Sequence, residues 1–560
     1  MTSVAFLLLL LSAPAAPTPS QLRSQTPAAY SIAGVIVDAV TGAPVSHAKL
    51  YVFTQNEELE TTADESGRFR FQTLEPGKYP LSATAPGYVR EAYEQHGAFF
   101  SGIVVGAGLD SEHLLFRLHP QGVIYGRVSD EHGDPVRHAS VQLFVRSQGR
   151  SARQNWPRNL TQTDDLGEYR FSGLAAATYF LTVQAQPWYA QHGLTNRIQR
   201  DPVSGGISGT NWKVDPLLDV VYPLIFYPGV TDSRSASKLN VSAGSREEAN
   251  IQLHAVPSVH VFFKNLPADE NSSSPSGVVA NPVNISASQK IFGSFAAGIS
   301  TTLGQVSPGE FEVTGIPPGE VIFTIGAPGN QPNGMMRTFN ATVVGGDTLD
   351  LAAAPPMVNV SGRVLPKPAD ADIEQFELTL VDDDDRSASS KLRKDATFSF
   401  TPVQAGTYKP YLRSPRGRHF IQQLSASGAK VHGTEVTFDG THDAQLTITL
   451  VPGVGQITGV AQLDGKPKAG ALVLLVPQSH DGFDDALRID QSDSDGTFSL
   501  RNILPGKYWL MAIQDGWDLE WANPVVLQPF NAGAQVMQIA PDETKKMTVN
   551  VQRKPKNNSH

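Results

Sequence analysis

The sequence contains no cysteine among its 560 residues. This absence excludes a disulfide framework, a thiol nucleophile, and zinc-finger, iron–sulfur or other thiolate metal sites. Positive charge is also scarce, because 44 Lys and Arg stand against 54 Asp and Glu and give a net charge of −10. That sign is the wrong one for binding nucleic acid or an anionic lipid surface, so we expect neither partner.

Long apolar runs are confined to the amino terminus. Leucines fill positions 7–11, and Ala13-Pro14-Ala15 follows them, a pattern typical of a secretory signal peptide that we place at residues 1–20. The run is shorter than the roughly 20 apolar residues that span a bilayer, so we expect no membrane span in the mature chain. Together with the lack of disulfides, this predicts a secreted, periplasmic or cell-surface protein of a bacterial envelope.

Glycine and proline are abundant, at 49 and 40 residues, and much of this excess belongs to an internal repeat. The copies that match best share a glycine in the opening strand, within Gly-x-Val at Gly126-Arg127-Val128, and units one and two continue through a Gly-x-Pro-Val turn. These copies close with an Asp-x-x-Gly turn, as at Asp164 to Gly167. Units one and five then have a Pro-Gly-Lys-Tyr corner, as at Pro76 to Tyr79, which Ala177-Thr178-Tyr179 replaces in unit two. Copies recur about every hundred residues, which suits tandem β-sandwiches, each with its own core.

The residues between the turns alternate with period two, as at Phe69 and Phe71, which is typical of strands with one buried face. In the Asp-x-x-Gly turn, the aspartate is expected to bond its own backbone while the glycine takes a positive φ. Each copy is therefore predicted to run strand, turn, strand.

These motifs resemble the carboxypeptidase regulatory-like domain, a transthyretin-like sandwich of seven strands. The resemblance implies an all-β chain of tandem antiparallel β-sandwiches, arranged as beads on a string. We place the units at 29–119, 120–254 with an insertion near 187–224, 255–355, 356–452 and 453–553, with a tail at 554–560. The third and fourth units match the repeat only in part.

Candidate chemical sites are few. One His-x-x-Glu pair, His432 and Glu435, has the spacing of two zinc ligands in zinc peptidases. His442 is too near in sequence to be the usual third ligand. We therefore predict no catalytic residues. For calcium, the hard oxygens of Asp490, Asp493 and Asp495 are the weak candidates, with a second acidic run at 382–385. Both acidic stretches also fit ordinary turns, so we expect no cofactor. Calcium binding stays open as the alternative.

Aromatic residues supply the ligand-binding candidates. Trp517 and Trp521 enclose Asp518 and Glu520, a set that can stack on a sugar ring and accept its hydroxyl protons, or fold over the end of the sandwich. A Tyr-x-Gln-His-Gly sequence occurs in equivalent loops of units one and two, and it is either a pair of binding loops or a recurring structural turn. Its candidate residues are Tyr93, His96, Tyr189 and His192.

The pattern favours a non-catalytic binding and scaffolding protein that contacts a carbohydrate or an envelope protein. Two alternatives stay open, an accessory subunit of a peptidase and the arm of an outer-membrane assembly of the TonB type. The resemblance is specific for the fold rather than for an activity, because this sandwich serves as a spacer, a binding module or an appendage to enzymes.

Overall fold

The computed structural model describes residues 29–54, 57–146, 155–200, 207–211, 215–266, 283–292, 295–307, 309–326, 337–350, 353–366, 373–382, 386–400, 402–413, 419–478 and 486–554. The predicted signal peptide at 1–20 and the tail beyond residue 554 lie outside these residues.

Strands dominate the described residues, which confirms the predicted all-β fold of tandem sandwiches. Five separate hydrophobic cores lie along the chain, within residues 32–118, 124–253, 259–349, 358–450 and 457–551. We number the units one to five in that order, while their boundaries stay a prediction. None of the helices in the described ranges has the length and apolar character needed to cross a membrane.

Units one and two share a two-sheet plan. Unit one holds β1 (Tyr30–Asp38), β2 (Lys49–Phe53), β3 (Glu58–Thr62), β4 (Arg68–Leu74), β5 (Gly77–Tyr79), β6 (Leu81–Thr84), β7 (Glu91–Ala92), β8 (Ile103–Val105) and β9 (Leu114–Leu118). Unit two holds β10 (Gly122–Ser129), β11 (Ser140–Arg146), β12 (Asn155–Gln162), β13 (Glu168–Leu174), β14 (Ala177–Gln184), β15 (Asn196–Arg200), β16 (Ile207–Asn211), β17 (Val220–Val221), β18 (Ile225–Phe226), β19 (Leu239–Val241), β20 (Arg246–Glu248) and β21 (Ile251–Gln252), with a 3-10 helix at Ser233–Ser235. The short strand β22 (Val256–Pro257) begins the predicted unit three and pairs with β17 of unit two. The hairpin of β15 and β16 lies inside the predicted insertion.

In its described residues, unit three is an eight-stranded sandwich, although its sequence matches the repeat only in part. It pairs the sheet β26-β27-β23-β30 with β25-β24-β28-β29. Its strands are β23 (Val259–Lys264), β24 (Asn284–Ile291), β25 (Phe295–Ile299), β26 (Thr302–Ser307), β27 (Glu310–Ile316), β28 (Gly319–Gly326), β29 (Arg337–Val343) and β30 (Asp347–Asp350).

Units four and five complete the chain. Unit four holds β31 (Met357–Val358), β32 (Val360–Leu365), β33 (Glu377–Asp382), β34 (Ser387–Lys391), β35 (Thr397–Ser399), β36 (Val403–Gln404), β37 (Gly406–Arg413), β38 (His419–Ser427), β39 (Lys430–His432), β40 (Glu435–Phe438) and β41 (Ala444–Pro452), with a 3-10 helix at Ile373–Gln375. Unit five holds β42 (Gly455–Leu463), β43 (Lys466–Pro467), β44 (Leu472–Pro477), β45 (Arg488–Gln491), β46 (Thr497–Ile503), β47 (Gly506–Ile513), β48 (Gln535–Ile539) and β49 (Thr544–Gln552), with short helices at Gly516–Asp518, α2 (Pro524–Leu527) and Gln528–Gly533.

The expectation of wholly antiparallel sheets is wrong in every unit, and at two places in unit five, where β47 also pairs in parallel with β49. The first long strand pairs in parallel with a late strand that returns beside it, in the pairs β1 with β9, β10 with β20 and β21, β23 with β30, β32 with β41, and β42 with β49. A long connection through the other sheet, rather than a hairpin, joins the two strands of each parallel pair. The late strand can therefore run in the same direction as the first strand.

This parallel pairing explains the glycine of the Gly-x-Val opening. In unit five, a Cβ at Gly459 would lie 2.1 Å from the backbone oxygen of Met547 on β49. Gly126 is in the same situation, 2.2 Å from the oxygen of Ala249. The glycine is therefore required by the close approach of the neighbouring strand rather than by its own φ.

The Pro-Gly-Lys-Tyr corner also has a defined role. The Tyr508 hydroxyl donates to the backbone oxygen of Leu504, four residues earlier, at 2.6 Å. Tyrosines of units one, two and four repeat this bond at 2.8, 2.9 and 2.8 Å, from Tyr79, Tyr179 and Tyr408. The bond fixes the turn before the last strands of these four sandwiches.

We expect Tyr508→Phe to destabilise unit five by about 1–2 kcal/mol, because the partly buried Leu504 oxygen loses its donor. Hydrogen exchange of the β47 amides should rise accordingly, since exchange reports local stability. Tyr411→Phe is the control, because Tyr411 is half exposed on β37. Equal exchange in the two variants would contradict this role.

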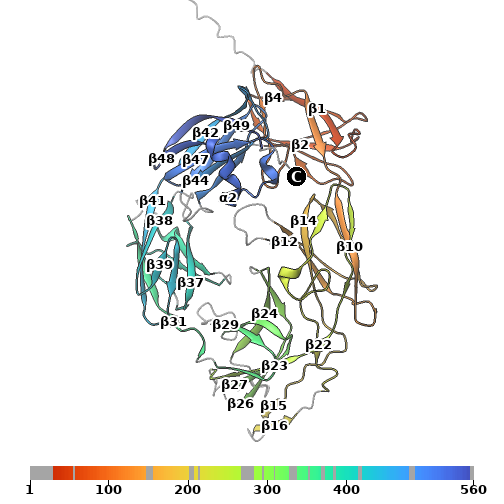
Figure 1. The fold of residues 1–560 in the computed structure, drawn as a ribbon, viewed down its shortest axis with the longest axis vertical. Helices are drawn as coiled ribbons and strands as arrows, with labels where there is room; N and C mark the ends of the chain where they lie inside the picture. The colour runs from red at the N-terminus through yellow and green to blue at the C-terminus, as the bar shows by residue number, and fades with distance from the viewer. Residues whose placement is uncertain are drawn as a thin grey trace, which may run out of the picture.

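The five units follow one another around a ring rather than along an open string (Figure 1). Units one and five, which begin and end the described chain, lie side by side at the top of this view. Hydrogen bonds join them directly, for example from the Ser101 hydroxyl to the Ser492 backbone oxygen. The open string expected from the repeat is therefore corrected, because the two end units have complementary polar loops.

Candidate functional site

The contact between units one and five is made mostly by polar groups that are removed from water. Ser101 donates to the oxygen of Ser492 at 2.9 Å, and both residues are fully buried. The Gly102 amide donates to Asp493 Oδ1 at 2.9 Å, and the Ser494 amide donates back to the Gly102 oxygen at 3.0 Å. We call this contact the closing interface, formed by Lys78, Glu94, His96, Phe99, Ser101, Gly102 and Val104 of unit one with Gln491, Ser492, Asp493, Ser494 and Trp517 of unit five.

An ion pair lies within the closing interface. Lys78 Nζ lies 2.6 Å from Asp493 Oδ2, and Asp493 is only 3% exposed. Burial raises the pKa of Asp493 above its ordinary value, while Lys78 opposes that rise. Because an isolated buried carboxylate is costly, Asp493 depends on unit one for its partners.

Two of the ligand-binding candidates meet at the closing interface. The His96 and Trp517 rings stack with centroids 5.0 Å apart and planes 9° from parallel. Trp517 Nε1 donates to the Gly470 oxygen at 3.1 Å, and His96 Nδ1 lies 3.1 Å from Gln491 Oε1. Tyr93 packs nearby, edge-on against the core ring of Phe116. The first Tyr-x-Gln-His-Gly loop is therefore a structural contact with unit five.

The remaining residues of the tryptophan motif support unit five itself. Trp521 is buried among apolar side chains of a second cluster behind β44 and β47. Asp518 forms an ion pair with Lys554, and the Glu520 backbone oxygen accepts the Asn523 amide at 2.8 Å. Trp517 and Trp521 consequently do not form a shared exposed platform.

The second Tyr-x-Gln-His-Gly loop lies where units two and three meet. His192 Nδ1 is 3.1 Å from Asp219 Oδ1, and the other oxygen of Asp219 is 2.6 Å from His260 Nε2. His260 Nδ1 in turn lies 2.6 Å from Glu312 Oε1, whose side chain is fully buried. Tyr189 donates from its hydroxyl to Glu131 at 3.2 Å. The loop thus begins a chain of alternating imidazoles and carboxylates between the two units.

An aromatic contact lies at the same joint. Phe292, at the tip of the β24–β25 hairpin of unit three, packs against Phe144, Phe180 and Phe226 of unit two, with centroids 5.1–5.3 Å apart. Buried aromatic contacts of this kind add about 1 kcal/mol each beyond the area they bury. Units two and three are therefore fixed relative to one another.

The histidine network predicts a pH dependence. The bond to Glu312, together with the bond to Asp219, raises the pKa of His260 to about 9 from its ordinary 6.5. Because its pKa is raised on folding, His260 stabilises the folded joint fully below pH 6.5. This stabilisation amounts to at most about 3 kcal/mol and is lost as the pH rises through 9. Hydrogen exchange at β23 and β27 should therefore increase between pH 6.5 and 9.5, after correction for intrinsic rates. His260→Gln should abolish this excess, and an unchanged excess in that variant would contradict the assignment.

The calcium candidates have other partners. Asp490 accepts the amides of Ser499 and Gln491 at 2.7 and 2.9 Å, and burial raises its pKa. Asp495 accepts the amide of Thr497 within its own turn. In the described ranges, no group of three or more His, Asp or Glu is arranged to hold a metal ion. Residues 383–385 of the other acidic run lie outside the description.

The His-x-x-Glu pair is part of a hairpin. His432 ends β39 and faces Glu435, the first residue of β40. Both are exposed. Their spacing is accounted for by the turn that joins the two strands.

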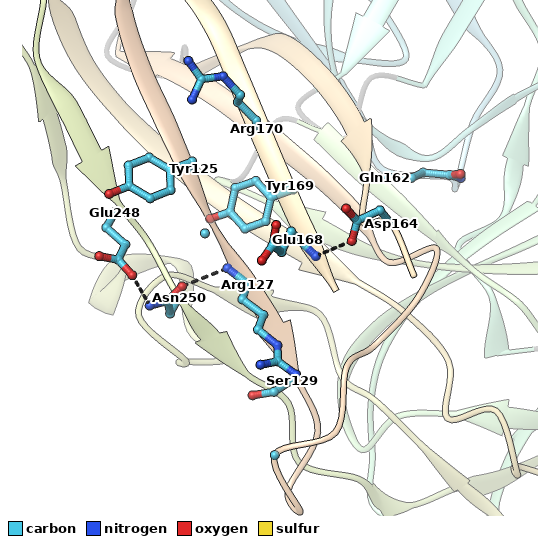
Figure 2. Close-up of a pocket in the computed structure, with 12 residues that line it drawn as sticks. Tyr125, Arg127, Ser129, Gln162, Asp164, Glu168, Tyr169, Arg170, Glu248 and Asn250 are labelled. Carbon is cyan, nitrogen blue, oxygen red and sulfur yellow. Dashed lines mark hydrogen bonds between the residues drawn. The ribbon is translucent and has the colours of Figure 1, made fainter. Parts of the chain in front are cut away.

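A polar groove crosses the outer face of unit two and was not predicted. Figure 2 shows its side chains extending from neighbouring strands, Tyr125 and Arg127 from β10, and Glu168 and Arg170 from β13. Its volume is about 780 Å³. We define this unit-two groove by Tyr125, Arg127, Glu168, Arg170, Glu248 and Asn250.

The sequence matches a known domain family over its first two units. The family model of the carboxypeptidase regulatory-like domain matches residues 31–117 and 123–200. These ranges are two tandem carboxypeptidase regulatory-like domains. The motifs that suggested the resemblance lie within them, so that prediction is confirmed for units one and two. No curated protein matches the chain.

Several solved structures match the chain at low identity and low TM-score. The Bacillus anthracis TIE protein is 10% identical, with 93% of this chain and 68% of that chain covered and a TM-score of 0.15. GBS52, the minor pilin of Streptococcus agalactiae, is 12% identical over 41% of this chain and 97% of that one, with a TM-score of 0.19. BcpA, the major pilin subunit of Bacillus cereus, is 10% identical over 77% and 99%, with a TM-score of 0.14.

The groove distinguishes the second regulatory-like domain from the first. Tyr125 lies opposite Arg170 in the β10–β13 pairing, and the equivalent residue of the first domain is Ala33, opposite Arg70. Units four and five carry Ser361 and Thr458 at this position. The sequence signal was therefore an aromatic residue where the other copies of the Gly-x-Val opening have small side chains.

Proposed function

We propose that this chain is a non-catalytic, exported protein of the cell envelope, and that it acts as a scaffold presenting its surface to a carbohydrate or protein partner. The observation that supports this most is the closing interface. A protein that buries Asp493, Ser101 and Ser492 to join its two ends gains a fixed arrangement of its sandwiches. Such an arrangement reduces the entropy lost when a partner binds several units at once.

The placement of the reactive side chains supports a non-catalytic role. The imidazoles of His192 and His260 contact carboxylates between units two and three, and His96 is stacked on Trp517. These groups hold units together, which is a structural use of residues that often serve as acids or bases in enzymes.

Export is proposed from the apolar run at 7–11 and the Ala13-Pro14-Ala15 sequence after it. Expression of the full chain in a bacterial host followed by cell fractionation tests it. We expect the protein outside the cytoplasm with a new amino terminus near residue 20. Recovery of the uncleaved chain in the cytoplasm would contradict export.

Catalysis is tested by incubating the purified chain with a peptide library in the presence and absence of zinc. The proposal predicts no hydrolysis above background in either case. Hydrolysis that requires zinc and is lost in His432→Ala would replace the scaffold with a peptidase function.

A further inference from the structure

We propose that the unit-two groove binds a neutral oligosaccharide. This inference rests on the proposed function as a scaffold and names one site and one ligand class for it. The groove volume of about 780 Å³ falls within the range of roughly 300–1,000 Å³ for ligand sites.

The aromatic component of the site is Tyr125, which is half-buried in the groove wall. The guanidinium carbon of Arg246 lies 5.5 Å from the centre of its ring, a cation–π contact that restrains the ring. A restrained aromatic side chain with a polar tip is suited to contact with a sugar ring, because it offers an apolar body beside a hydroxyl that can both donate and accept.

The polar components have unused hydrogen-bonding capacity. Within the described residues, the guanidinium groups of Arg127 and Arg170 and the carboxylate of Glu168 make no hydrogen bond or ion pair. Glu248 accepts one bond from Asn250, at 2.8 Å, and keeps one carboxylate oxygen for another donor. Donors and acceptors therefore line the same groove without satisfying one another.

The balance of charge favours a neutral ligand. Asp164, which also lines the groove, uses Oδ1 to accept the amides of Leu166 and Glu168 in its own turn. These hydrogen bonds leave Asp164 ionised, and the guanidinium of Arg246 lies over the Tyr125 ring. The ionised side chains at the groove are therefore three of each sign, namely Arg127, Arg170 and Arg246 against Asp164, Glu168 and Glu248. A polyanion or a polycation would meet like charge on one side, whereas sugar hydroxyls both donate to carboxylates and accept from guanidinium groups.

The fold does not require these side chains. Unit one carries Ala33 and Val35 in place of Tyr125 and Arg127, and its sandwich has a complete core of its own. Unit five carries Val460 where unit two has Arg127. The substitutions Tyr125→Ala and Arg127→Val therefore introduce the residues that unit one has at the equivalent positions, and unit two is expected to stay folded.

The test screens the full chain for binding to cellohexaose, maltohexaose, xylohexaose and chitohexaose, with hexagalacturonic acid as the acidic probe, and then measures affinity by calorimetry. We expect one neutral hexasaccharide to bind, and Tyr125→Ala and Arg127→Val each to weaken it by about tenfold or more. Trp188→Ala is the matched control, because Trp188 is an aromatic residue of unit two that is 91% exposed and outside the groove.

The outcomes separate this inference from the proposed function. Neutral binding that is unchanged in Tyr125→Ala and Arg127→Val overturns the groove as the site and leaves the scaffold intact. Binding only to hexagalacturonic acid, or to no probe, overturns the ligand class. Failure of the scaffold itself would instead be seen as free movement of units one and five, which is measured without any ligand.

Discussion

The double variant His96→Ala/Gly102→Val is expected to open the ring. A Cβ at Gly102 would lie 2.5 Å from the Lys78 side chain and 3.1 Å from Asp493 Oδ1, so valine displaces both members of the ion pair. Loss of the His96–Trp517 stack removes about 1 kcal/mol more. Leaving Asp493 buried without its unit-one partners costs about 3–5 kcal/mol in the closed form, so the open form becomes favoured.

Small-angle X-ray scattering measures this change as a larger radius of gyration. Both substitutions lie in unit one, so the Asp-x-x-Gly turn of unit five stays intact. His113→Ala/Gly106→Val is the matched control, because both residues lie in unit one outside the closing interface. Scattering curves that agree between the two double variants would contradict the closing interface.

Gly459→Ala is expected to destabilise unit five by about 3 kcal/mol or more, since overpacking of this kind forces the backbone to move. The added Cβ would lie 2.1 Å from the Met547 oxygen and 2.8 Å from the Phe498 ring. The β42–β49 pairing must then separate, which exposes the core of unit five. Because unit five closes the ring, opening is expected as a secondary effect.

Limited proteolysis with mass spectrometry measures this effect, with early cleavage inside residues 453–553. Gly298→Ala is the control, because a Cβ at Gly298 meets nothing within 4 Å. Equal protease resistance in Gly459→Ala and Gly298→Ala would show that the parallel strand does not constrain the opening glycine.

The local features of each sandwich were predictable because they depend on neighbours in sequence. Asp164 bonds the amides of Leu166 and Glu168, and Gly167 has a φ of 74°, as the Asp-x-x-Gly pattern predicts. Period-two alternation likewise placed Phe69 and Phe71 in the core. Such signals need only a few adjacent residues.

The contacts between units could not be predicted from neighbouring residues in the sequence. Asp64, Asp164 and Asp493 occupy the same turn position, yet the first two are exposed and only Asp493 is buried. The difference arises from Gly102 and Lys78, which lie 391 and 415 residues away in sequence. A turn that resembles a solvated loop or a calcium site is consequently indistinguishable, by sequence, from one that docks onto another unit.

The parallel strands and the unit-two groove were missed for different reasons. The late strand of each unit carries no motif, so its direction had no sequence signal. Tyr125 lies within a motif that was assigned to the fold, although its counterparts Ala33 and Thr458 show that the fold does not need an aromatic side chain there. Comparing the repeats position by position would have identified it.

The distance between units one and five tests the closed ring most directly. Because the chain has no cysteine, Val40→Cys and Val536→Cys provide two unique spin-label sites, at residues that are 63% and 68% exposed. Double electron–electron resonance should give one narrow distance distribution for this labelled chain, and a broad one once His96→Ala/Gly102→Val is added. A broad distribution that the added substitutions leave unchanged would contradict the closed ring.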